Sequence, residues 1–391
     1  MSRDLLVAGG GIAGLAAAIG ARAAGWEARL FEQAARFSEI GAGLQLGPNA
    51  TRILREWGVL ERLELRACEP ARLCVRDALD GRELGVLRLG PRARESYGAP
   101  YLTVHRADLH AALLAHARSQ GAHLHTGQRI ASLDCDEEAA RARIGNGADV
   151  IAEAAVVADG VWSALREQLL RDGPAPPTGH VAYRALLPAA DLEPGVRLDE
   201  VQAWLGPAMH LIAYPVRSGT ALNVVGFIEG RSDATGWDQA AQADALRSVA
   251  RGLCRDLQAL VDSVPAWRLW PVHDRQPLRS ADEMARGRCV LLGDAAHPMR
   301  PYLAQGAGMA LEDAWELQRV LRMCDGKVVD VPTALKRLAL NRSERCARVQ
   351  RRSRRNGAVF HADGVLRWAR NTAMRLLGER LIDLPWLYRG A

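Results

Sequence analysis

Three glycines and one acidic residue near the N-terminus have the spacing of a dinucleotide-binding turn. Gly9, Gly11 and Gly14 follow a short apolar run at residues 4–8 and open an alanine-rich helical pattern. The first glycine allows a tight turn, the second lets a pyrophosphate approach the backbone, and the third lets helix pack on strand. The next strand pattern ends at Glu32, where a carboxylate accepts hydrogen bonds from ribose hydroxyls. If the glycine-rich loop bound no ligand, an acidic residue at the end of the second strand would be a coincidence. We therefore predict dinucleotide binding.

A second glycine-rich stretch, residues 293–308, lies towards the other end of the chain. It follows an apolar strand-like run at 289–292 and precedes a helical pattern over 309–323. A strand, a glycine-rich turn and a helix start together direct backbone N–H groups at an anion. The stretch therefore predicts a site for the reactive end of a flavin.

A histidine and a tyrosine share one face of a predicted strand in the middle of the chain. From about residue 180, short strand patterns alternate with turns, which is typical of an antiparallel meander. The alternation places His210, Ile212 and Tyr214 on one face and Leu211 and Ala213 on the other. Because histidine titrates near neutral pH, His210 is a candidate general base, with Tyr214 as its relay. A buried structural pair held by hydrogen bonds is the alternative.

Three other polar residues have both a structural and a functional interpretation. Asn49 is a good N-cap for a helix at 50–57, or it belongs to a loop that folds over the cofactor. Arg106 stands at a predicted helix start, where it reaches a phosphate or is a surface arginine. Asp159 caps the helix after a buried strand, or it forms a functional motif with Gly160.

Composition bounds the class of protein. The chain has 391 residues, 49% of them hydrophobic, which is ample for a large core shared by two domains. Its seven cysteines form no C-x-x-C pair and no metal-ligand spacing. We therefore expect free thiols, no metal site and a cytoplasmic location. The sequence contains no uninterrupted apolar stretch long enough to span a bilayer.

The net charge of +6 comes almost entirely from arginine. Nucleic-acid binding needs basic residues clustered with aromatic ones, whereas these are dispersed apart from one group within residues 345–355. We interpret that group as a solvated helix face, with an acidic partner or a membrane surface as the lesser alternative. Neither nucleic acid nor membrane is therefore expected as a partner.

The order of the motifs resembles that of the FAD-dependent aromatic hydroxylases of the para-hydroxybenzoate hydroxylase type. The dinucleotide turn comes first, Asp159-Gly160 second and Gly293-Asp294 third. The closer likeness is to the salicylate, 3-hydroxybenzoate and 6-hydroxynicotinate hydroxylases, and it covers essentially the whole chain. The segments that carry it are 41–49, 105–109, 293–298 and 303–306.

The resemblance implies an α/β fold with an α+β substrate part. A Rossmann-like FAD-binding domain, split in sequence, would be followed by helices at the C-terminus and would pack on an antiparallel substrate sheet. The implied limits are 1–70, 100–180 and 270–325 for FAD binding, 71–99 and 181–269 for the substrate sheet, and 326–391 for the helical segment.

The resemblance also implies a monooxygenase that holds FAD and uses NADH or NADPH as a transient co-substrate. O2 would form a flavin C4a-hydroperoxide, which a small electron-rich aromatic substrate attacks; a carboxylated phenol or hydroxypyridine is expected. The chain would be a monomer or homodimer. The alternatives are a monooxygenase of a larger polycyclic substrate, a non-oxygenating flavin oxidoreductase and a flavin-bound redox sensor.

Individual residues take roles from the same resemblance. The implied catalytic residues are His210, Tyr214 and Gln305. The implied cofactor-binding residues are Gly9, Gly11, Gly14, Glu32, Gln45, Arg106, Asp159, Asp294, Gly306, Ala307 and Gly308. The implied substrate-pocket residues are Arg184, Pro301 and Tyr302.

Overall fold

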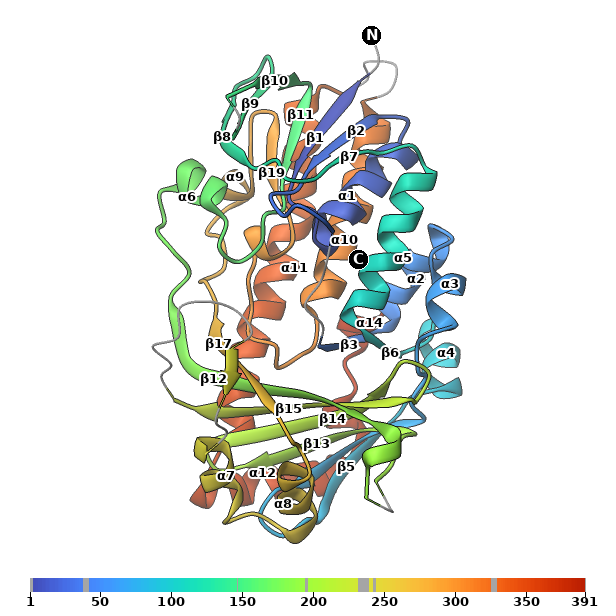
Figure 1. The fold of residues 1–391 in the computed structure, drawn as a ribbon, viewed down its shortest axis with the longest axis vertical. Helices are drawn as coiled ribbons and strands as arrows, with labels where there is room; N and C mark the ends of the chain where they lie inside the picture. Colours follow the sequence, from blue (N-terminus) through green and yellow to red (C-terminus); the bar gives the residue numbers. More distant parts are fainter. Residues whose placement is uncertain are drawn as a thin grey trace.

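The structure is a computed structural model that describes residues 3–37, 42–145, 147–193, 196–230, 239–241, 244–324 and 329–390. Gly41, in the first of the segments that carry the closer family likeness, lies outside the described residues. Figure 1 shows a mainly parallel sheet with helices at one end of the molecule and a second sheet at the other.

A six-stranded sheet organises the end that carries the N-terminus. Its strand order is β18-β19-β11-β1-β2-β7, and every pair is parallel except β18–β19. The central strands are buried apolar runs because helices cover the sheet, with α1, α5 and α10 packing around it. The strands are β1 (Asp4–Ala8), β2 (Glu27–Phe31), β7 (His123–His125), β11 (Ala154–Val157), β18 (Ala285–Arg286) and β19 (Cys289–Leu291). The helices are α1 (Ile12–Ala23), α5 (Arg106–Ser119) and α10 (Gly306–Met323).

Two small antiparallel sheets and several short helices complete this half. The small sheets are β8 (Ile130–Cys135), β9 (Ala140–Ile144) and β10 (Asp149–Ala152), and β3 (Gly43–Leu46) with β6 (Leu102–His105). The short helices are α2 (Pro48–Glu56), α3 (Leu60–Glu64), α4 (Pro91–Tyr97), α6 (Ala164–Leu170), α9 (Ala281–Met284) and the 3-10 turn η2 (Gly293–Ala295).

An eight-stranded sheet forms the other end. Its order is β16-β17-β12-β15-β14-β13-β4-β5, antiparallel throughout except for the β13–β4 pair. Helices α7 (Asp244–Ala250) and α8 (Arg255–Asp262) cover one face, where Leu211 and Ala213 are buried. The strands are β4 (Arg72–Asp77), β5 (Glu83–Arg88), β12 (Pro177–Pro188), β13 (Glu200–Gly206), β14 (Met209–Val216), β15 (Ala221–Glu229), β16 (Gln239–Ala241) and β17 (Trp267–His273); η1 (Ala189–Asp191) follows β12.

The C-terminal helices connect the two ends of the molecule. The long α11 (Val331–Phe360) packs on α10 and on β19, and α12 (Gly364–Leu377) packs on β5 (Figure 1). Two short helices follow, α13 (Glu379–Ile382) and α14 (Pro385–Tyr388). Within the described part of the chain, no helix combines the length and the apolar character needed to cross a membrane.

The predicted fold class is confirmed, and so is the alternation in β14. Two helix starts differ from the prediction. The helix predicted over 309–323 begins three residues earlier, at Gly306, and α2 begins at Pro48. The prediction that Asn49 caps this helix is therefore wrong: Gly47 occupies the cap position without a side-chain hydrogen bond.

Candidate active site

A cavity of about 280 Å³ lies between the first turn of α1, the start of α10 and one face of the eight-stranded sheet. Loop residues after β11 and β19 also line it. Residues that were predicted from separate motifs thus share one space. Those that line it are Gly11, Gln45, Arg106, Arg184, Tyr214, Asp294, Pro301, Gln305, Gly306 and Ala307.

Close backbone packing explains two glycines of the N-terminal turn. Gly9 has a φ of +102°, and a Cβ there would lie 2.5 Å from the carbonyl oxygen of Ala158. A Cβ on Gly14 would lie 1.9 Å from the carbonyl oxygen of Gly9. The tight turn brings the start of α1, which has no side-chain cap, to the cavity at Gly11. Its unpaired backbone N–H groups are suited to a pyrophosphate.

Glu32 is fixed beside this turn by two backbone hydrogen bonds. Gly10 N donates to Glu32 Oε2 at 2.7 Å, and Ala34 N donates to Glu32 Oε1 at 2.7 Å. Each carboxylate oxygen can accept more than one hydrogen bond. The carboxylate is thus held at the carboxyl end of β2, with acceptor capacity left for ribose hydroxyls.

The start of α10 forms a second anion-binding end of the cavity. Gly306 and Ala307 line the cavity in the first turn of a helix that has no side-chain cap. Asp294 is exposed on the cavity side, and a Cβ on Gly306 would lie 3.9 Å from its Oδ1. Gly308 lies deeper and is buried. Two helix starts and a carboxylate facing one cavity match the charge pattern of a dinucleotide.

Arg106 and Asp159 flank the cavity differently. Arg106 is the first residue of α5 and lines the cavity. Asp159 is not the cap of α6, because Ser163 Oγ accepts from Arg166 N at 3.0 Å in that role. Burial raises the pKa of Asp159, and its Oδ1 has no hydrogen-bond partner among the described residues. A buried acceptor of this kind fits a cofactor hydroxyl, so the site as a whole fits FAD.

Tyr214 and Arg184 face the cavity from the eight-stranded sheet. Tyr214 is buried, and a Cβ on Gly43 would lie 2.6 Å from its ring, so only glycine lets β3 pack there. Burial raises the pKa of Tyr214, against the opposing effects of Arg184 and Gln45. The Arg184 guanidinium lies over the ring of Trp270, 4.6 Å from its centroid. A phenol O–H and a cation therefore meet the cavity on the side of the eight-stranded sheet.

His210 lies on the same face of β14 but in a separate cluster. It is fully buried, stacks on Phe227 with centroids 4.5 Å apart, and contacts Tyr302 edge-on at 4.8 Å. Its Nδ1 lies 2.7 Å from His361 Nε2. Burial, then the charges of His361 and His180, lower its pKa well below the ordinary value.

Several predicted site residues are not brought together. Neither His210 nor Tyr302 is among the described residues that line the cavity. His210 and Tyr214 are four residues apart along an extended strand, a spacing of about 13 Å, and their contacts are with different partners. The two side chains are therefore too far apart to exchange a proton directly, and a relay between them needs an intervening group.

Gln305 immediately precedes α10 and lines the cavity. Asn49 Nδ2 donates to Gln305 Oε1 at 3.0 Å and to Glu312 Oε1 at 2.8 Å. The sequence pattern leaves Asn49 either as a helix cap or as part of a loop over the cofactor, and it assigns no role to Glu312. Only the packing of α2 on α10 reveals their connection to Gln305.

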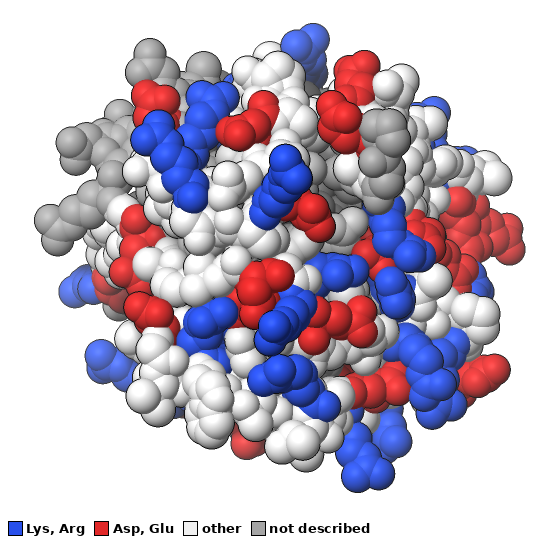
Figure 2. All heavy atoms as spheres, turned by 90° about the horizontal axis from the view of Figure 1, so that it is seen from below, with Lys and Arg blue, Asp and Glu red and all other residues white. Residues whose placement is uncertain are grey.

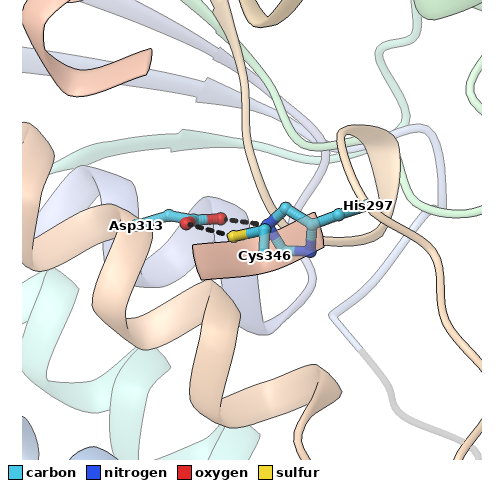
Figure 3. Close-up of side chains that lie close together, drawn as sticks. All are labelled: His297, Asp313 and Cys346. Carbon is cyan, nitrogen blue, oxygen red and sulfur yellow. Dashed lines mark hydrogen bonds and ion pairs between the residues drawn. The ribbon is translucent and has the colours of Figure 1, made fainter. Parts of the chain in front are cut away.

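A buried charge cluster supports the loop between β19 and α10 (Figure 3). Figure 3 shows His297 and Cys346 converging on Asp313, whose Oδ2 lies 2.6 Å from His297 Nε2. Arg342 Nε donates to Asp313 Oδ1 at 2.9 Å, and Gly293 N donates to Oδ2 at 3.0 Å. Burial opposes ionisation, yet His297 and Arg342 hold the pKa of Asp313 below its ordinary value.

The same three side chains could hold a metal ion by type and proximity. Burial opposes a charge on His297, but Cys346 and Asp313 raise its pKa well above the ordinary value, which favours the imidazolium form. Arg342 is a second cation on Asp313. We interpret the cluster as an ion-paired support of the loop, because a divalent cation would meet two positive groups. Of its members, only His297 lay in a stretch that the sequence singled out.

Three comparisons with known proteins agree with this geometry. Residues 2–328 match the family model described as FAD binding domain. The chain is 36% identical over 387 residues to the 3-hydroxybenzoate 6-hydroxylase of Polaromonas naphthalenivorans (strain CJ2), covering 98% of this chain and 95% of the relative. It is 38% identical over 355 residues to the 6-hydroxynicotinate 3-monooxygenase of Bordetella bronchiseptica, covering 90% and 91%. The fold is similar to that of a salicylate hydroxylase in a substrate complex, with a TM-score of 0.84, 26% identity, and coverage of 100% and 96%.

Proposed function

This chain belongs to the FAD binding domain family, and from that premise we propose that it is an FAD-dependent monooxygenase. It consumes NADH or NADPH together with O2 and hydroxylates a small, electron-rich aromatic substrate. Both relatives act on rings that carry a hydroxyl and a carboxylate, as their names state. We extend that substrate class to this chain.

One observation carries the proposal: a single cavity joins the starts of α1 and α10 to the face of the eight-stranded sheet that carries Arg184 and Tyr214. Gly11 and Asp294 stand at one part of this cavity, and Tyr214 and Arg184 at another. A cavity that served only to store a dinucleotide would not need a phenol and a guanidinium on a separate sheet. The arrangement supports chemistry between a bound cofactor and a second molecule.

The chain's own residues hold and orient the reactants. Gly9 to Gly14, Glu32, Arg106 and Asp294 would hold FAD, which supplies electron transfer from NAD(P)H to O2 and delivery of one oxygen atom. The backbone N–H groups of Gly306 and Ala307 favour negative charge beside the start of α10. Such an interaction stabilises a charge by about 0.3–1 kcal/mol when exposed, and by more when buried.

Substrate activation requires loss of a ring hydroxyl proton, since an ionised ring is more electron-rich. His210 is the proposed proton acceptor, with His361 at 2.7 Å beside it. Because His210 does not line the cavity, the proton would reach it through an intervening group. Apolar side chains of the sheet, Ile212, Val225 and Phe227, line the cavity and exclude water from the reacting atoms.

A substrate screen tests the proposed function. Purified holoenzyme is mixed with hydroxylated benzoates and hydroxypyridine carboxylates while NADH or NADPH consumption and product mass are recorded under 18O2. We expect at least one compound to stimulate consumption and to gain one labelled oxygen atom. Stimulated consumption without label in any product would indicate a non-oxygenating oxidoreductase, and turnover of only larger polycyclic compounds would contradict the substrate class.

A further inference from the structure

We propose that Asn49 and Glu312 fix the side-chain amide of Gln305 so that its NH2 group faces the cavity and donates a hydrogen bond to a substrate oxygen. The inference rests on the proposed function, because it names the substrate group that Gln305 recognises. Asn49 and Glu312 act as positioning residues.

The orientation begins at Glu312, whose charge is fixed by two arginines. Arg342 Nη1 and Arg345 Nε each donate to Oε2 at 2.6 Å, and Arg345 Nη2 donates to Oε1 at 2.7 Å. Burial alone would raise the pKa of Glu312, but the two guanidinium groups hold it low. Glu312 is therefore a carboxylate, which can only accept hydrogen bonds.

Asn49 in turn determines which atom of the Gln305 amide faces it. Since Glu312 only accepts, the Asn49 atom that faces it at 2.8 Å must be the NH2 group. The same nitrogen lies 3.0 Å from the Gln305 amide, so the Gln305 atom that meets it must be the carbonyl oxygen. The reverse orientation would place two NH2 groups against each other in a buried site, at the cost of unpaired donors. The Gln305 NH2 group is thus directed away from Asn49.

The helix is built around this pair of amides. Gln305, Gly308 and Glu312 are spaced at i, i+3 and i+7, so they share one face of α10. A Cβ on Gly308 would lie 2.8 Å from Gln305 Oε1 and 3.3 Å from Asn49 Nδ2. Glycine at 308 therefore provides the space that the hydrogen bond between the two amides occupies.

A second series of hydrogen bonds orients the Gln45 amide beside Tyr214. Tyr101 Oη donates to Gln45 Oε1 at 2.7 Å, which directs the Gln45 NH2 group to its other side. Burial raises the pKa of Tyr214, and the hydrogen bond with Gln45 opposes this effect, as a donor to the phenol oxygen does. With Arg184 nearby, this part of the cavity presents donors. Substrate oxygens that accept hydrogen bonds are favoured over amine donors at these positions.

The test reverses the orientation of the Gln305 amide by substituting Glu312, which does not line the cavity. In Glu312→Gln, the side-chain oxygen takes the Oε2 position, where both arginines donate, and the new NH2 group takes the Oε1 position. That NH2 group replaces the acceptor of Asn49 and of Arg345 Nη2, which turns Asn49 and then Gln305. Dissociation constants are measured in the FAD-loaded protein by flavin absorbance titration with 3-hydroxybenzoate, 3-hydroxybenzamide and 3-aminobenzoate. We expect the preference for 3-hydroxybenzoate over one analogue to fall about ten-fold, the effect of losing one hydrogen bond to a charged group. If the preference over 3-hydroxybenzamide falls, Gln305 donates to the substrate carboxylate. If the preference over 3-aminobenzoate falls, Gln305 donates to the oxygen of the ring hydroxyl.

Two further variants keep the test decisive. Asn49→Leu removes the anchor without adding a charge, and it should reduce the same preference if Glu312→Gln does not fold. The matched control is Gln318→Leu, which breaks another buried α2–α10 hydrogen bond, from Trp57 Nε1 at 2.7 Å. It should lower the melting temperature and leave the ratios of dissociation constants unchanged.

Two outcomes overturn the inference, and they are distinguishable. If the unmodified enzyme hydroxylates 3-hydroxybenzoate but Asn49→Leu and Glu312→Gln shift all three dissociation constants by one factor, only the role of Gln305 fails. If the unmodified enzyme binds none of the three probes and the screen yields no labelled product, the proposed function fails, and this inference with it.

Discussion

His210 combines the chemistry of a proton acceptor with surroundings that oppose a lasting charge. Its ring is enclosed by Phe227, Tyr302 and His361, and burial holds the pKa of the imidazole low. The short distance between His210 Nδ1 and His361 Nε2 would let a proton on either ring be shared with the other. The site suits brief acceptance of a proton better than storage of one.

We expect His210→Gln to lower hydroxylation by about a hundred-fold, the size of effect that a general base has. FAD should stay bound, because His210 is not among the described residues that line the cavity, while NAD(P)H oxidation becomes uncoupled from product. Product formed per NAD(P)H consumed and the flavin spectrum measure both effects, with the exposed His123→Gln as control. If His210→Gln hydroxylates at the same rate as the unmodified protein from about pH 6 to pH 9, His210 is not the base.

Residue roles that depend on local spacing were predictable, and those that depend on distant contacts were not. Gly9 and Gly14 are required by contacts within one βαβ unit, which the spacing of the sequence encodes. Asn49 has a strong local signal for a helix cap, yet its partners lie 256 and 263 positions away. A polar residue beside a helix start satisfies both interpretations until the partner helix is placed.

At the scale of elements, α10 has two functions along its length. Its first turn faces the cavity, and its second and third turns carry Glu312 and Asp313 into a buried network with α2 and α11. His297 connects the same network to the loop after β19, as Figure 3 shows. The position of the cavity end of α10 thus depends on charges buried one turn or more behind it.

Breaking this network should destabilise the fold strongly. Asp313→Asn leaves His297 without its buried counter-charge and removes one of the two acids that pair with Arg342, and removal of one partner of a buried pair costs about 3–5 kcal/mol. Urea denaturation of the apoprotein measures the loss directly. Asp149→Asn, which breaks an exposed ion pair with Arg143, is the control and should leave the midpoint unchanged. A shift as small as the control's would show that the cluster is not an ion-paired support.

Element types followed from the periodicity of the sequence, but the surroundings of one helix did not. The arginine group within residues 345–355 was interpreted as a solvated face of a helix, and that is wrong for its inner members. Arg345 pairs with Glu312, and Arg354 pairs with Asp274 at 2.9 Å. Arg348 is exposed, as predicted, and its guanidinium lies 4.0 Å from the ring centroid of Trp386. Periodicity identifies the helix, whereas the acids and the ring that meet it come from other segments.

At the scale of the whole molecule, the charge is distributed rather than concentrated. Figure 2 shows arginine and lysine side chains interspersed with acidic ones over the face at the end that carries the eight-stranded sheet. The inner arginines of α11 are used in contacts within the chain. Both observations weaken the alternative of a flavin-bound redox sensor, which would need a charged surface for its partner.

A histidine cluster joins the eight-stranded sheet to the C-terminal helices, and its titration governs how the fold responds to acid. His180 from β12, His210 from β14 and His361 after α11 lie together, with Arg300 and Glu229 beside them. Burial lowers the pKa of each histidine, to about 4 for His361. Above the ordinary value of 6.5, neither the folded nor the unfolded state binds these protons. As the pH falls from 6.5 towards 4, the unfolded chain binds protons that the folded chain does not, so the free energy of unfolding decreases.

We therefore expect the protein to lose stability between about pH 6.5 and pH 4, before most carboxylates titrate. His361→Gln removes about one proton from the difference between the two states, so its free energy of unfolding should fall less steeply over this range. Urea denaturation at about pH 7.5, 6 and 5 gives the slope, and the exposed His123→Gln should retain that of the unmodified chain. If His361→Gln loses stability as steeply as the unmodified protein, His361 binds its proton equally in the folded and unfolded states, and its surroundings do not lower its pKa. The pair of His210 and His361 would then become charged near the ordinary pKa of histidine rather than well below it.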